Sequence, residues 1–110
     1  MAKPARRGHV FIELGADRSV RTERRPDRGL LGGMMGLPTS DWGAEATAPK
    51  FPSEGNWQDV GEVRHVFTHF SLTLTVWCLE QPAGDFQTSI VDAADGLPSV
   101  FAKALKLAVI

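Results

Sequence analysis

The chain has 110 residues, of which 43% are hydrophobic, and its formal net charge at pH 7 is −1. This length supports one domain with a single modest core. The nearly neutral charge argues against a strongly basic nucleic-acid binder that acts alone.

Charge is distributed unevenly along the chain. Residues 1–28 contain eight Lys and Arg and four acidic residues, whereas the rest of the chain contains four Lys and Arg and nine acidic residues. A basic N-terminal flank is typical either of a surface that faces phosphate groups or of a solvated linker. Residues 1–8 also carry a Pro and a Gly, which predicts a linker there, followed by a single domain over residues 9–110.

Cysteine content and hydropathy exclude several other classes of protein. The one cysteine, Cys78, excludes an internal disulfide framework, a four-cysteine zinc site and a self-contained iron–sulfur cluster. Since it lies in an apolar stretch, we expect a buried thiol. No apolar run approaches the ~20 residues of a membrane span, and the N-terminal residues lack the apolar segment of a signal peptide. We therefore expect a cytoplasmic protein without a membrane partner.

Two strands are expected first, at about residues 9–15 and 19–24, with a turn between them at residues 15–18. Apolar and mixed positions alternate in the first strand. We therefore expect the face that carries Val10 and Ile12 to pack and the other face to be partly exposed.

An irregular region follows. Residues 29–42 contain four glycines and a proline, which exclude a stable helix and leave room for a short strand near residues 34–37. Residues 43–58 form a predicted loop, in which Phe51 and Trp57 are the expected anchors to the rest of the domain.

The clearest strand pair covers residues 62–66 and 71–79, and residues 85–91 are expected to add another strand. Residues 98–107 begin with a proline and continue with good helix formers, so they predict a C-terminal helix. Its apolar stripe consists of Leu97, Val100, Phe101, Ala104 and Leu105. Together these elements predict an α+β domain, with a mixed or antiparallel sheet and one or two helices packed on it.

The junction between the two clear strands carries the candidate recognition chemistry. A hydroxyl donates and accepts hydrogen bonds, an imidazole can do either, and a phenyl ring can stack or wedge, so these groups suit the edge of a nucleic-acid base. The candidate recognition residues are Phe67, Thr68, His69, Arg64 and His65. From the residues alone, the favoured alternative is a hairpin corner whose polar groups are satisfied. No metal site is expected, because the two histidines have no third ligand near them.

The glycine-rich segment lacks the patterns of the common phosphate-binding loops. It contains neither a P-loop nor the dinucleotide fingerprint, so its glycines are expected to serve sharp backbone turns. Basic residues beside it could contact phosphate groups. These candidates are Arg24, Arg25 and Arg28, with Arg6, Arg7 and Arg21 further along the basic flank.

Three blocks in register carry a family resemblance: RRPDRGLLGGMMGLPTSDW, GEVRHVFTHFSLTLTVW and LPSVFAKALKL. In this order and spacing they resemble the C-terminal domain of bacterial adenine DNA glycosylases of the MutY family. The resemblance implies a Nudix-like fold that recognises 8-oxoguanine paired with adenine in double-stranded DNA. In that family a Phe-Ser-His loop approaches the lesion, and Phe67-Thr68-His69 matches that loop, with Thr68 keeping the hydroxyl and adding a methyl group.

The resemblance also implies a division of labour. The adenine would be excised by a separate N-terminal catalytic domain, a hydrolase with a 4Fe–4S cluster, and the present chain would be a non-catalytic, monomeric fragment that docks on that domain. No cofactor is expected in the chain itself.

Two alternatives stay open. One is a Nudix pyrophosphohydrolase, but the glycine-rich segment is followed by no Glu at the offset of the Nudix box, so a divalent metal would lack its carboxylates. The other is a protein-interaction module of the same fold, in which exposed Trp42, Phe51 and Trp57 would form the docking surface.

Overall fold

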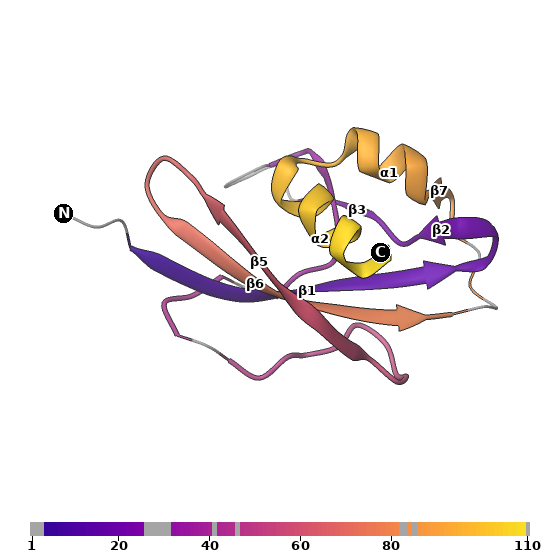
Figure 1. Cartoon of the computed structure of the whole chain (residues 1–110), viewed down its shortest axis with the longest axis horizontal. Helices are drawn as coiled ribbons and strands as arrows, with labels where there is room; N and C mark the ends of the chain where they lie inside the picture. The colour runs from indigo at the N-terminus through magenta and orange to yellow at the C-terminus, as the bar shows by residue number, and fades with distance from the viewer. Residues whose placement is uncertain are drawn as a thin grey trace.

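The structure is a computed structural model, and it describes residues 4–25, 32–40, 42–45, 47–81, 84 and 86–109. These residues form a mixed sheet with two helices on one face and a long irregular segment along the other (Figure 1). The strands are β1 (Ala5–Gly15), β2 (Ser19–Val20), β3 (Glu23–Arg24), β4 (Met35–Gly36), β5 (Gln58–Val66), β6 (Ser71–Glu80) and β7 (Thr88–Ser89). The helices are the 3-10 turn η1 (Ala16–Arg18), α1 (Ile90–Gly96) and α2 (Ser99–Val109). The predicted α+β class is confirmed.

The main sheet has the strand order β5-β6-β1-β2-β7. β1 and β6 run parallel through ten residue pairs, from Ala5↔Ser71 to Leu14↔Glu80, and the other neighbours are antiparallel. β3 and β4 form a separate two-stranded sheet. Beyond β2, the free edge of β1 is covered by the described residues of the segment 38–43 (residues 38–40, 42 and 43), which exchange four backbone hydrogen bonds with it at 2.7–3.1 Å.

The helix-facing side of the sheet holds the main core. Alternation in β6 buries Leu72, Leu74 and Val76 completely, and the apolar stripe of α2 packs over them. This confirms the apolar stripe predicted for the C-terminal helix. Val63 of β5 is half-buried against this core.

The opposite side of the sheet is covered as well, which corrects the expectation that this face of β1 is partly exposed. Phe11 and Glu13 are 3% and 4% exposed. The irregular segment 47–57 packs on them through Phe51, whose ring lies 5.7 Å from that of Phe11 and 5.4 Å from that of Trp57. The anchoring role predicted for Phe51 and Trp57 is therefore confirmed, and burial on both faces makes β1 the central strand.

Several predicted boundaries differ from the structure. β1 begins at Ala5, inside the segment for which a linker was predicted, because its N-terminal residues pair with β6. The predicted strand over residues 19–24 is divided into β2 and β3. The predicted strand over residues 85–91 is wrong: β7 has two residues, and α1 follows because the hydroxyl of Ser89 accepts a hydrogen bond from the backbone N–H of Asp92 at 3.1 Å and caps the helix.

A buried carboxylate joins the irregular segment to the sheet. Glu13 accepts hydrogen bonds from Arg21 (3.1 Å), Ser53 (2.9 Å) and Gln81 (3.2 Å). Three partners satisfy the charge, since a buried carboxylate without partners would be strongly destabilising. The ion pair between Arg7 and Glu62, at 3.6 Å, is more than half exposed on both sides.

We expect Glu13→Ala to lower the free energy of unfolding by about 2–4 kcal/mol, because it removes three charge-assisted hydrogen bonds and leaves their donors behind. Glu62→Ala, which breaks only the exposed ion pair, is the control and is expected to cost less than about 1 kcal/mol. Urea denaturation followed by far-UV circular dichroism measures both. Equal losses for the two variants would show that the Glu13 network does not hold the segment.

Candidate functional site

The hairpin between β5 and β6 presents the predicted recognition residues at its tip. The backbone N–H of Phe67 donates to the carbonyl of Phe70 at 2.8 Å, which closes a tight turn. Thr68 and His69 occupy the two central positions and are exposed, whereas Phe70 is buried and Phe67 is half-buried. The turn thus holds a hydroxyl and an imidazole toward solvent beside one phenyl ring.

Phe67 belongs to a cluster of rings, which we call the hairpin ring cluster and which consists of Trp42, His65, Phe67 and Phe70. The ring of Phe67 stacks on Trp42 (centroids 6.4 Å apart, 22° between planes), meets the edge of His65 (4.6 Å, 62°) and lies 4.9 Å from Phe70. Offset and edge-to-face contacts at these distances are favourable beyond area burial. They hold Phe67 in place from behind, so its orientation does not depend on the exposed tip alone.

Trp42 reaches Phe67 because β1 leaves space for it. A Cβ atom at Gly8 would lie 2.6 Å from Cδ1 of Trp42, so any side chain there would displace the indole. The indole also packs on Phe101 of α2, with centroids 6.4 Å apart. Its Nε1 is buried without a hydrogen-bond partner in the described part of the chain.

Arg25 extends the cluster. Its guanidinium lies over Trp42 (4.8 Å) and Phe101 (5.7 Å), and its NH1 donates to the hydroxyl of Thr39 at 3.5 Å. Its Nε is buried and has no partner within the described ranges. Arg25 therefore packs behind the hairpin as a stacked cation, as expected when a weakly hydrated guanidinium meets aromatic faces.

His65 connects the cluster to α2. The ammonium group of Lys103 donates a hydrogen bond to Nδ1 of His65 at 3.2 Å, which requires a neutral ring that accepts at this atom. Burial lowers the pKa of His65 from its ordinary value of 6.5, and the positive charge of Lys103 lowers it further.

The predicted site residues separate into two groups. The first group lies at the hairpin and consists of His65, Phe67, Thr68 and His69. Arg25 joins this group through its contact with Trp42. Arg64 lies on the opposite face of β5, because strand alternation turns it away from His65 and pairs it with Thr73. Arg24 is exposed on β3, and Arg28 lies outside the described residues.

Sequence reasoning missed Trp42 and Lys103 as members of this region, and it missed the ring contact of Arg6, which it named only as a possible phosphate contact. Trp42 was considered only as a docking residue beside Phe51 and Trp57, but Trp42 packs on the helix face of the sheet and the other two on the opposite face, so that docking surface is not formed. The contacts of Lys103 with His65 and of Arg6 with Phe70 join residues far apart in the sequence. A local sequence pattern cannot predict contacts of this kind.

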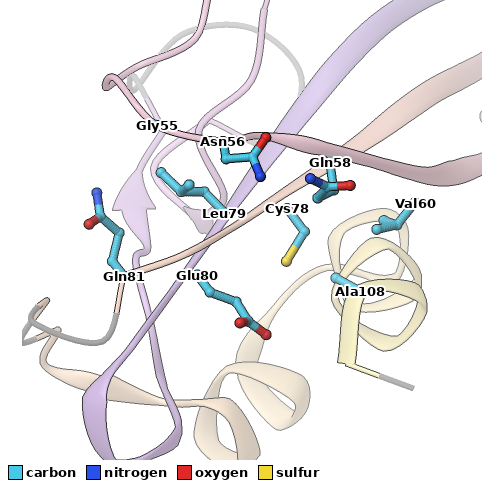
Figure 2. A pocket seen from close by; sticks show the side chains of 9 residues that line it. All are labelled: Gly55, Asn56, Gln58, Val60, Cys78, Leu79, Glu80, Gln81 and Ala108. Atoms are coloured by element: carbon cyan, nitrogen blue, oxygen red, sulfur yellow. The ribbon is translucent and has the colours of Figure 1, made fainter.

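A separate hollow of about 560 Å³ lies at the other end of β6. Figure 2 shows the amides of Asn56 and Gln58 on one side of it and the carboxylate of Glu80 on the other, with the thiol of Cys78 between them. Cys78 is buried as predicted, and burial, with a smaller contribution from Glu80, raises the pKa of its thiol. None of the predicted recognition residues lines this hollow.

Two further observations concern the described residues only. They contain no group of three or more His, Cys, Asp or Glu side chains placed to hold a metal ion. No helix among them is long and apolar enough to cross a membrane.

The fold defines an α+β domain with a central parallel strand pair, two helices on one face and a ring-backed hairpin at one end of the sheet. The chain belongs to the NUDIX domain family, whose model matches residues 9–107. Among solved structures it is similar to the C-terminal domain of mouse MUTYH, determined in complex with human PCNA, with a TM-score of 0.61 and 19% identity over 94% of this chain and 85% of that chain. None of the curated proteins matches the sequence. The Nudix-like fold implied by the resemblance is confirmed.

The position of His65 predicts a measurable pH effect. We expect its pKa, followed by NMR, to lie below 6.5 in the folded chain. Lys103→Ala should raise it part of the way back, because burial, the larger cause, remains. The contribution of neutral His65 to the free energy of unfolding is complete above pH 6.5. It is lost as the pH falls toward the folded pKa, because the unfolded chain takes up the proton first. Lys50→Ala, on the far loop, is the control. A His65 pKa unaffected by Lys103→Ala would contradict the contact.

Proposed function

We propose that this chain is the lesion-recognition domain of an adenine DNA glycosylase and that it reads 8-oxoguanine opposite adenine. The observation that carries the proposal is the hairpin tip, where the exposed Thr68 and His69 stand beside a Phe67 ring that is braced by three other rings. The similarity in fold to the C-terminal domain of mouse MUTYH and the family resemblance of the three sequence blocks support it.

The chemistry of the tip matches that of the lesion. 8-Oxoguanine carries an O8 acceptor and an N7–H donor where guanine has an N7 acceptor. The hydroxyl of Thr68 can donate to one of these groups or accept from the other, and His69 adds a second polar group. The braced ring of Phe67 suits a wedge or a stacking partner for a neighbouring base, because it can enter the duplex without losing its orientation.

In this proposal the chain recognises the lesion, and a separate catalytic domain, with the 4Fe–4S cluster that the resemblance implies, excises the adenine in the cytoplasm of a bacterium. The absence of a Nudix box supports this division. The residues that follow the glycine-rich segment, as far as the structure describes them between positions 37 and 57, form no helix that could present metal-binding glutamates. A Nudix pyrophosphohydrolase needs such carboxylates to hold its divalent metal.

The tip can be tested in the full-length glycosylase that the proposal implies. Thr68→Ala should reduce the preference for 8-oxoguanine:adenine over guanine:adenine by about 1–2 kcal/mol, because a contact to the altered base edge is lost. Phe67→Ala should weaken binding to both duplexes. Thr73→Ala, a threonine of β6 away from the tip, is the matched control. Single-turnover excision rates on the two duplexes measure the preference. An unchanged ratio of the two rates for Thr68→Ala would show that the hairpin tip has a structural role and does not read the lesion.

The hydrolase alternative has a direct test. We expect the purified chain to show no Mg²⁺-dependent hydrolysis of 8-oxo-dGTP, since the carboxylates of the Nudix box are missing from the sequence. Release of pyrophosphate or phosphate measures the activity. Turnover that requires the metal and saturates with substrate would favour the pyrophosphohydrolase.

A further inference from the structure

Basic residues on the two faces of the sheet differ in whether a carboxylate of the chain pairs with them, as four of these residues show. On the loop-covered face, Arg7 is paired with Glu62 at 3.6 Å and Arg21 with Glu13 at 3.1 Å. On the helix-covered face, Arg6 of β1 and Lys103 of α2 have no carboxylate partner in the described part of the chain, although both are exposed. Strand alternation separates the neighbours Arg6 and Arg7, which pair with Leu72 and Thr73 respectively.

The two unpaired cations are nevertheless held in place. The guanidinium of Arg6 lies 4.4 Å from the ring centre of Phe70, and the ammonium of Lys103 lies 3.2 Å from Nδ1 of His65. Phe70 and His65 both contact Phe67. Both cations are therefore positioned against the hairpin ring cluster, one from β1 and one from α2.

Such an arrangement favours an external anion. A cation–ring contact and a hydrogen bond to a neutral imidazole restrict a long basic side chain without neutralising its charge. An acidic partner from the chain itself would compete for that charge, and the described residues provide none here. Phosphate groups of a nucleic-acid backbone are the anions that such spaced, preplaced cations neutralise with release of counterions.

We propose that Arg6 and Lys103 bind backbone phosphates of a DNA duplex, so that the nucleic-acid surface extends from the hairpin tip onto β1 and α2. This inference rests on the proposed function for the identity of the nucleic acid, but it concerns contacts that do not depend on the lesion. Of the basic residues that the sequence suggested as phosphate contacts, the proposal keeps Arg6 and adds Lys103. It leaves out Arg7 and Arg21, which carboxylates of the chain pair, and Arg24, Arg25 and Arg28.

The test uses the purified 110-residue chain and an undamaged duplex oligonucleotide, with affinity measured by fluorescence anisotropy over a range of low salt concentrations. Arg6→Ala and Lys103→Ala should each reduce the slope of log K against log salt by about 1, because one phosphate contact is lost. The controls Arg7→Ala and Lys50→Ala remove the same charge from the other side of the sheet and should leave the slope unchanged. Circular dichroism establishes that each variant is folded.

Equal effects in test and control variants would reduce the binding to net charge and overturn the proposal. Unchanged slopes for Arg6→Ala and Lys103→Ala, or no measurable binding of the duplex at the lowest salt, would overturn it as well. The outcome is separable from lesion reading: a reduced slope together with an unaffected lesion preference in Thr68→Ala would keep the phosphate surface and reject the proposed reading of 8-oxoguanine.

Discussion

The parallel pairing of β1 with β6 is the constraint on which the rest of the structure depends. It places the N-terminal strand in the middle of the sheet and brings Gly8 beside Leu74 and Arg6 beside Leu72, next to the strand that leaves the hairpin. Parallel strands need a long crossover, and here the crossover supplies both the segment 38–43 along β1 and the segment that covers the second face. Trp42, one of the three rings that brace Phe67, reaches it only through this pairing, whereas His65 and Phe70 belong to the hairpin itself.

Local patterns sufficed for much of the fold. The alternation in β6 and the apolar stripe of α2 identify faces that bury their residues, because periods of 2 and 3.6 residues are properties of the backbone itself. The hairpin tip was also located from its residues, since the two strands flank it directly. The start of α1 was missed although Ser89 and Asp92 form a capping pair, because a short apolar run favours strand and helix alike.

The remainder depends on contacts between distant positions. The face of β1 that carries Phe11 and Glu13 is covered by Phe51 and Ser53, some forty residues away in the chain. Trp42 and Phe67, or His65 and Lys103, likewise meet only when the sheet and α2 are assembled. Such contacts have no periodicity and no motif, so the composition of the site around the hairpin tip could not be read from spacing.

The segment 38–43 has a second consequence through its hydrogen bonds to β1. A long strand with an open edge is a template for pairing with another molecule, and this segment occupies that edge. The same segment carries Trp42, whose indole supports Phe67. Detachment of the segment would therefore release the ring behind the hairpin and at the same time expose a surface on which chains could aggregate. Colloidal solubility and the integrity of the recognition surface are thus coupled through one stretch of backbone.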